Sequence, residues 1–185
     1  MKIYIASDLH GSYKGAKKFF DIFDSAKASG EDAYAVLLGD IYNHGPRNPL
    51  PEEYAPMSVA KLLNDHADSI SVIKGNCDSE VDQMISEFEF VQNLDMLFSS
   101  HRVLFTHGHK CSVYMPKMYG RSGDIVFYGH FHKPQIECKD GVIYVCVGAI
   151  GISPEGVEKS YAVLDEKGVE IHSLYTNEVI ATYMF

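Results

Sequence analysis

Short apolar runs alternate with amphipathic segments in the first half of the chain. Residues 2–7, 34–38 and 70–73 are rich in Ile, Val, Tyr and Ala, and polar residues or glycine follow each run. Such runs are typical of strands that are buried in a parallel sheet. Between them, apolar residues recur at helical spacing over 16–26 and 59–66. The order strand, helix, strand, helix, strand predicts a parallel sheet with right-handed crossovers.

The second half of the chain changes to a strand-rich pattern. Apolar runs over 102–106 and 125–128 predict two more buried strands. Turn residues at 139–141 and 166–168 divide the following apolar runs into two hairpins, and a last strand covers 179–183. The sequence therefore predicts an α/β fold with a β-rich C-terminal half. Two sheets that form a sandwich, with helices outside it, satisfy this order.

Composition and charge narrow the class of protein. The chain has 185 residues, 46% of them hydrophobic, and no apparent linker or repeat, so we expect a single domain over 1–185. Sixteen basic and 25 acidic residues give a net charge of −9, which argues against long nucleic acid and anionic membranes as partners. No apolar run approaches the ~20 residues of a membrane span. Without a signal-peptide pattern or a Cys-x-x-Cys pair, we expect a cytoplasmic protein with reduced cysteines.

Metal-ligand side chains follow almost every predicted strand of the first three-quarters of the chain. Because sites in open α/β sheets form outside the carboxyl ends of strands, we expect these side chains to converge. Two pairs, Asp8 with His10 and His130 with His132, have the spacing i, i+2. In extended backbone this spacing places both side chains of a pair on one face. Imidazole, carboxylate and amide ligands suit Mn, Fe, Co, Ni or Zn. The candidate metal-binding residues are Asp8, His10, Asp40, Asn76, His107, His109, His130 and His132.

The order of these motifs is similar to that of a known family. The motif order over residues 8–132 resembles that of the calcineurin-like metallophosphoesterase superfamily. The motifs are, in order, Asp-x-His, Gly-Asp, Gly-Asn, His and Gly-His-x-His. The stretches 43–56 and 75–84 resemble one branch of it, the small bacterial phosphodiesterases of the YfcE type. The resemblance implies a four-layer αββα sandwich with mixed sheets. It also implies a hydrolase with two divalent metal ions, most often Mn²⁺, although Ni²⁺, Co²⁺, Fe²⁺ and Zn²⁺ stay open.

The resemblance also implies a role for each ligand. Asp8, His10 and His132 would hold the first metal, and Asp40 would bridge both metals. Asn76, His107 and His130 would complete the second site. A metal-bridging hydroxide would attack the phosphorus in line, so Asp40 and Asn76 count among the catalytic residues, and Asn76 would also contact the substrate. His109 is not a ligand in the family pattern, and we expect it behind the ligands or in a loop.

This sequence departs from the wider family pattern near the ligands. Cys77 stands where the family usually has a histidine that protonates the leaving alkoxide, so we expect good leaving groups, such as aryl esters, to be favoured. His44 is an alternative acid. Arg47 could bind the substrate phosphate or be a solvated loop arginine. Asn43 replaces a carboxylate, which predicts weaker orientation of a ligand. Phe131 is expected to point into the core.

A third departure lies near Gly148, where the Asn-Pro-Gly-Ser run that relatives often carry is absent. In relatives this loop lies near the rim of the active site, so its substrate contacts are open.

The resulting hypothesis is a metal-dependent phosphodiesterase that hydrolyses small soluble phosphodiesters. A phosphomonoesterase or nucleotidase on the same dinuclear site is the main alternative, and a non-catalytic scaffold of the same fold is another. All seven ligand positions are retained, which favours an enzyme. The sequence does not name the physiological substrate. It also leaves the oligomeric state open, because Tyr114, Met115 and Met118 suit either a contact in a homo-oligomer or ordinary packing.

Overall fold

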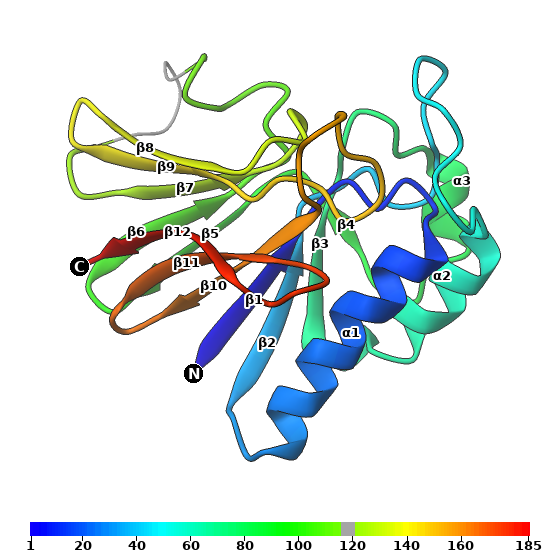
Figure 1. The fold of residues 1–185 in the computed structure, drawn as a ribbon, viewed down its shortest axis with the longest axis horizontal. Coiled ribbons are helices and arrows are strands. Elements are labelled where there is room, and N and C mark those ends of the chain that lie inside the picture. Colours follow the sequence, from blue (N-terminus) through cyan, green and yellow to red (C-terminus); the bar gives the residue numbers. More distant parts are fainter. Residues whose placement is uncertain (116–120) are drawn as a thin grey trace.

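The computed structural model describes residues 1–115 and 121–185, so Met118 lies outside the described residues (Figure 1). The first half follows the predicted alternation of strands and helices. Strands β1, β2, β3 and β4 pair in parallel in that order. The elements are β1 (Lys2–Ala6), α1 (Tyr13–Ala28), β2 (Ala33–Leu37), α2 (Pro56–Asn64), a 3₁₀ turn (Ala67–Ser69), β3 (Ile70–Ile73), α3 (Glu80–Met84) and β4 (Phe90–Val91).

The second half supplies the remaining strands and closes the sandwich. These strands are β5 (Leu94–Phe98), β6 (His101–Phe105), β7 (Ile125–Tyr128), β8 (Gln135–Lys139), β9 (Val142–Cys146), β10 (Ser160–Asp165), β11 (Gly168–Ser173) and β12 (Val179–Met184). One sheet has the order β12-β11-β10-β1-β2-β3-β4, and the other has the order β5-β6-β7-β9-β8. Both are mixed. In the first sheet, β1 to β4 are parallel and the antiparallel strands β10 to β12 extend one side. In the second sheet, antiparallel β5 and β8 flank the parallel strands β6, β7 and β9. The predicted sandwich of two mixed sheets is confirmed.

Strand β1 shows how the layers are held together. Ile3 and Ile5 are fully buried among residues of the second sheet, such as Phe127. Tyr4 and Ala6 point the other way and pack against apolar residues of α1 and α2. This alternation follows from the two-residue period of a strand. The outer face of the second sheet is covered, within the described residues, by Cys111 and Val113 of the segment after β6.

Three short elements were not predicted. Strand β5 alternates between partly buried and exposed residues, and β4 is only two residues long, so neither produces a long apolar run. Helix α3 has five residues, and its start is fixed by a capping box in which Ser79 and Asp82 bond each other's main-chain N–H groups. Among the described residues, no helix is both long enough and apolar enough to cross a membrane.

Candidate metal centre

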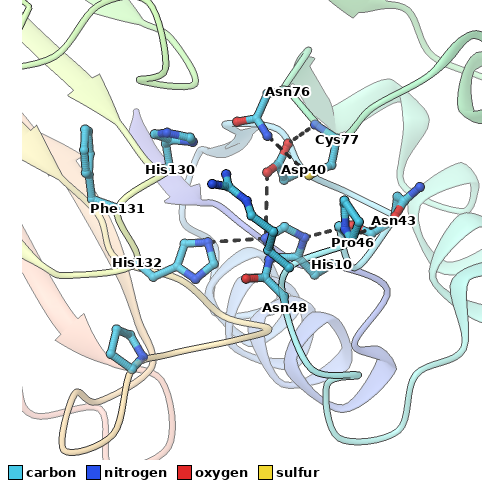
Figure 2. Close-up of a pocket in the computed structure, with 13 residues that line it drawn as sticks. His10, Asp40, Asn43, Pro46, Asn48, Asn76, Cys77, His130, Phe131 and His132 are labelled. Atoms are coloured by element: carbon cyan, nitrogen blue, oxygen red, sulfur yellow. Dashed lines mark hydrogen bonds and ion pairs between the residues drawn. The ribbon is translucent and has the colours of Figure 1, made fainter.

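The candidate ligands converge where strands of the two sheets end. Asp8 and His10 follow β1, Asp40 follows β2, and Asn76 follows β3, all from the first sheet. The second sheet contributes the remaining ligands, His107 after β6 and His130 and His132 after β7. Figure 2 shows most of them around one pocket, with the second-sheet histidines facing the first-sheet residues. The predicted convergence at the carboxyl ends of strands therefore matches the structure.

The backbone at these strand ends is left-handed rather than extended. Asp8 (φ 55°), His10 (φ 48°), Asp40 (φ 55°), His130 (φ 67°) and His132 (φ 54°) all have positive φ. The extended geometry that we expected for the i, i+2 pairs is therefore wrong, although each pair still shares the pocket. Residues other than glycine occupy this conformation at a cost of order 1–3 kcal/mol each, and such strain is concentrated at functional sites. The packing around the strand ends must therefore impose this backbone.

Glycines allow these strained turns to approach one another closely. A Cβ on Gly75 would collide with the Asp40 carboxylate, and a Cβ on Gly129 would collide with Ser7 Oγ. Because only glycine lacks a Cβ, these positions let the turns after β3 and β7 lie directly against those after β2 and β1.

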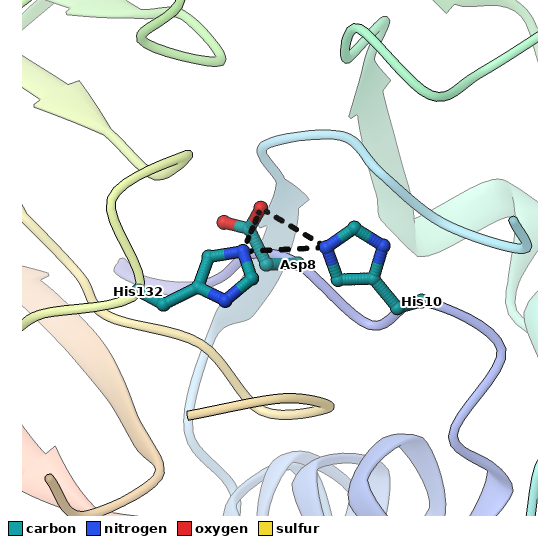
Figure 3. A group of neighbouring side chains, drawn as sticks. All are labelled: Asp8, His10 and His132. Atoms are coloured by element: carbon teal, nitrogen blue, oxygen red, sulfur yellow. Dashed lines mark hydrogen bonds and ion pairs between the residues drawn. The ribbon is translucent and has the colours of Figure 1, made fainter. Parts of the chain in front are cut away.

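The first ligand group consists of Asp8, His10 and His132 (Figure 3). His10 Nδ1 lies 2.8 Å from the main-chain oxygen of Asn43, so this nitrogen carries the proton and Nε2 presents a lone pair. That lone pair faces His132 Nε2 at 3.3 Å. Asp8 Oδ1 lies 3.0 Å from His132 Nε2, and Asp8 Oδ2 accepts from the His130 main-chain N–H at 2.8 Å. Three donor atoms for a metal therefore point at one another.

The second group is arranged in the same way. His107 Nδ1 donates to the main-chain oxygen of Leu38 at 2.8 Å, which leaves Nε2 as an acceptor. This Nε2 lies 3.0 Å from Asn76 Oδ1 and 3.5 Å from Asp40 Oδ2. The second Asp40 oxygen, Oδ1, accepts from the main-chain N–H of Cys77 at 2.8 Å. Three acceptors thus face one another, an arrangement that suits a cation.

Charge and burial strengthen this fit. Asp8 is fully buried and Asp40 is 2% exposed, and buried carboxylates need positive partners. Burial alone would raise the pKa of Asp8, but the hydrogen bond from His132 and the charges of the neighbouring histidines outweigh it and lower that pKa. Burial lowers the pKa of His132, whereas its contact with Asp8 raises it more, and the net shift is upward. The residues present therefore fit divalent cations.

Asp78 is a supporting residue that sequence analysis missed. Its two carboxylate oxygens accept from the main-chain N–H groups of Asp40 (2.9 Å), Ile41 (2.8 Å) and Gly75 (2.7 Å). Burial raises the pKa of Asp78 to about 6, against the effect of these bonds. Its place two residues after Asn76 was the available signal. Asp78 ties the turn that carries Asp40 to the turn that carries Asn76.

Asn43 orients His10 through its main chain. The main-chain oxygen of Asn43 lies 2.8 Å from His10 Nδ1, and any residue would supply this oxygen. The Asn43 side chain instead accepts from the Gly45 N–H at 2.8 Å. Weaker orientation of a ligand through the missing carboxylate stays a prediction.

The pocket beside the ligands has a volume of about 700 Å³. Cys77 and Arg47 line it, as a role in catalysis or substrate binding requires. Burial and the Asp40 charge raise the pKa of the Cys77 thiol to about 12. His44 is not among the lining residues; its ring lies against Tyr54, with centroids 5.5 Å apart. His109 lies behind the ligands, with its ring centroid 5.3 Å from that of His107.

Phe131 corrects a prediction. Its side chain is 37% exposed and lines the pocket, whereas alternation between His130 and His132 had placed it in the core. The alternation rule holds for extended backbone, and both histidines are left-handed. Asn48 and Pro154 also line the pocket, and sequence analysis gave no signal for either.

This protein has two mixed sheets packed face to face, and histidine, aspartate and asparagine side chains gather at their adjoining strand ends. These features are typical of metal-dependent phosphoesterases. The model of the calcineurin-like phosphoesterase superfamily domain matches residues 1–168. This protein belongs to the calcineurin-like phosphoesterase superfamily.

Similar proteins agree with this assignment. Phosphodiesterase YfcE of Escherichia coli K12 is 36% identical over 183 residues, which cover 98% of this chain and 96% of YfcE. The structure of E. coli YfcE, described as a phosphoesterase, superimposes with a TM-score of 0.91 at 35% identity and covers 100% of this chain and 99% of that one. Vacuolar protein sorting 29 from Cryptosporidium parvum shares the fold, with a TM-score of 0.68, 15% identity, and coverage of 100% and 97%.

Proposed function

We propose that this protein is a metal-dependent phosphodiesterase that hydrolyses small phosphodiesters with two divalent metal ions, as a single domain. The observation that carries the proposal is the set of potential metal-ligand atoms that face one another, His10 Nε2 with His132 Nε2 and His107 Nε2 with Asn76 Oδ1. Nitrogen and oxygen atoms so arranged, beside buried carboxylates, are a ligand set for cations. The 36% identity to a phosphodiesterase over nearly the whole chain supports the same reaction.

In this proposal, Asp8, His10 and His132 hold one metal, and Asn76, His107 and His130 hold the other. Asp40 is the shared ligand. Mn²⁺ is the proposed metal because the family resemblance favours it, and imidazole, carboxylate and amide ligands also suit Fe, Co, Ni and Zn. Bound divalent ions would supply a nucleophilic water at neutral pH and offset the charge of the phosphoryl group.

The residues of the chain prepare the substrate around these ions. Arg47, exposed on the loop that lines the pocket, has the forked donors that bind two phosphate oxygens. Asn76 is a neutral ligand, so it adds no charge that would repel an anionic substrate. The hydrogen bonds of His10 and His107 to main-chain oxygens hold both rings so that their Nε2 lone pairs point inward.

Cys77 is the proposed reason for a preference among leaving groups. At neutral pH a thiol is a weaker proton donor than the histidine imidazolium of the family pattern. We expect aryl esters, which leave as stable phenolates, to be hydrolysed much faster than alkyl esters. Cys77→His should raise the rate on alkyl diesters by about 100-fold, the usual scale of general acid catalysis, and change aryl rates little. Cys138→His, at an exposed cysteine on β8, is the matched control.

The central test uses metal-free protein that is reloaded with Mn²⁺, Ni²⁺, Co²⁺, Zn²⁺ or Mg²⁺. Hydrolysis of an aryl phosphodiester should return with Mn²⁺ and exceed hydrolysis of the matching monoester. Calorimetry should give two bound ions per chain. Faster hydrolysis of the monoester would favour a phosphomonoesterase, and no hydrolysis of either ester with any metal would contradict the proposal.

A further inference from the structure

Beside the metal ligands, an aromatic surface that the proposed reaction does not use begins in the pocket lining with Phe131 and continues outside that lining with Tyr114. Phe131 is 37% exposed, and Tyr114, 64% exposed, contacts it with ring centroids 5.0 Å apart. We call Phe131 and Tyr114 the aromatic wall. Large apolar side chains that remain exposed in a pocket mark a binding surface when they continue into a functional site.

The aromatic wall is anchored, and within residues 1–115 and 121–185 both of its rings remain partly exposed. Phe131 meets His130 at 5.1 Å and Tyr128 at 6.1 Å between centroids, both with their ring planes nearly perpendicular. The Gln135 amide donates to the hydroxyl oxygens of Tyr114 and Tyr128 at 3.5 and 3.3 Å. Over residues 1–115 and 121–185, no aromatic ring is stacked parallel to Phe131. A planar group can therefore stack there.

The position of the aromatic wall indicates which of the two ester groups of a diester would lie against it. In Figure 2, Phe131 lies at the side of the pocket occupied by His130 and His132, and Cys77 lies at the opposite side. Position 77 is where the family pattern places the residue that faces the leaving group. A phosphate held between these sides would direct its leaving ester toward Cys77 and its other ester toward Phe131.

Resting on the proposed function, we propose that the aromatic wall binds the ester group that is not displaced, and that this group is a planar aromatic ring. The substrate class is then a small phosphodiester with an aromatic ring near the phosphate, either an aryl group or the base of a nucleoside. Phe131 and Tyr114 determine specificity in this proposal. The metal ligands do not, because the ions that they would hold act on the phosphate, which all phosphodiesters share.

The test keeps the leaving group constant and varies only the other ester. p-Nitrophenyl benzyl phosphate and p-nitrophenyl cyclohexylmethyl phosphate have the same linkage and similar size, but only the first can stack. The protein should prefer the benzyl ester in kcat/KM by about five-fold, in keeping with an aromatic contact. Phe131→Leu, which keeps apolar bulk without a ring, should bring this ratio close to one, and Tyr114→Ala should reduce it.

Phe185→Leu is the matched control, because Phe185 is also exposed (41%) but does not line the pocket. It should keep the five-fold ratio. Thymidine 5′-(p-nitrophenyl phosphate) distinguishes a nucleoside base from a simple aryl group as the ring that is bound. If its kcat/KM equals that of the benzyl ester and falls in Phe131→Leu, the wall accepts a nucleoside; if not, it accepts simple aryl groups.

A binding measurement makes the inference independent of turnover. Calorimetric titration of the Mn²⁺-loaded protein with benzylphosphonate and cyclohexylmethylphosphonate should show the same preference, lost in Phe131→Leu. Equal binding and equal kcat/KM in the unaltered protein, or a preference that survives both wall variants, would overturn the inference. Absence of diester hydrolysis together with a clear preference for benzylphosphonate would instead contradict the proposed function and leave the aromatic wall supported.

Discussion

The floor and the rim of the pocket are built in different ways. The floor, Asp8, Asp40 and His107, is buried, and its side chains are held by main-chain N–H and C=O groups as well as by one another. The rim, Arg47 and Phe131, is exposed and belongs to loops. The floor combines left-handed backbone with buried charge. Both features cost free energy of folding, and proteins retain them mainly at functional sites. The difference implies that the floor determines whether the reaction occurs and the rim determines which substrate is used.

The strongest challenge to this contrast is a change in the floor that removes a negative charge without creating a cavity. Asp40→Asn keeps the size of the side chain but removes the anion shared by the two proposed metals. We expect hydrolysis of an aryl diester to fall by about 1,000-fold, because even residues that only orient ligands are worth 10–100-fold. Calorimetry should show weaker Mn²⁺ binding.

Asp21→Asn, at an exposed aspartate paired with Lys17 on α1, is the matched control and should leave hydrolysis unchanged. Full activity in Asp40→Asn would show that the floor does not hold the catalytic cations.

A second prediction concerns the support beneath the floor. Asp78→Asn replaces one carboxylate oxygen with an NH₂ group. This group is a donor and cannot accept from the N–H groups of the turns that carry Asp40 and Asn76. We expect Mn²⁺ affinity to fall by about 10–100-fold and the melting temperature to drop. Asp124→Asn is the control, because Asp124 is equally buried and accepts from the Arg121 N–H, outside the pocket lining. It should lower stability without changing Mn²⁺ affinity.

Sequence reasoning found the floor better than its support or the rim. The proposed ligands stand out in the sequence because residues that can bind a metal follow successive strands, a pattern that few other functions produce. Asp78 was missed because it contacts only main-chain groups, which have no residue code. Phe131 was misplaced because the alternation rule was applied to left-handed backbone. The short strands β4 and β5 were missed because pairing with neighbouring strands, rather than a long apolar run, holds them in place.

At the rim, the expected effects are smaller and act on substrate binding. Arg47→Ala should raise KM for an aryl diester by about ten-fold, the value of one charge-assisted hydrogen-bond pair, with kcat little changed. Arg47→Lys keeps the charge but loses the planar fork, so it should recover only part of the affinity. Mn²⁺ binding should be the same in all three proteins. An effect on Mn²⁺ affinity would place Arg47 with the floor instead.

The smallest expected effect tests the boundary between floor and rim at Asn43. Its main-chain oxygen orients His10, whereas its exposed side chain only accepts from Gly45. Asn43→Asp restores the carboxylate of the family pattern and keeps an acceptor for the Gly45 N–H. If the main chain alone orients His10, Mn²⁺ affinity should stay within about three-fold of the original, well below the 10–100-fold typical of side chains that orient a ligand. A larger gain, measured by calorimetry, would mean that a side chain at position 43 acts on the metal centre and that the floor extends into the loop.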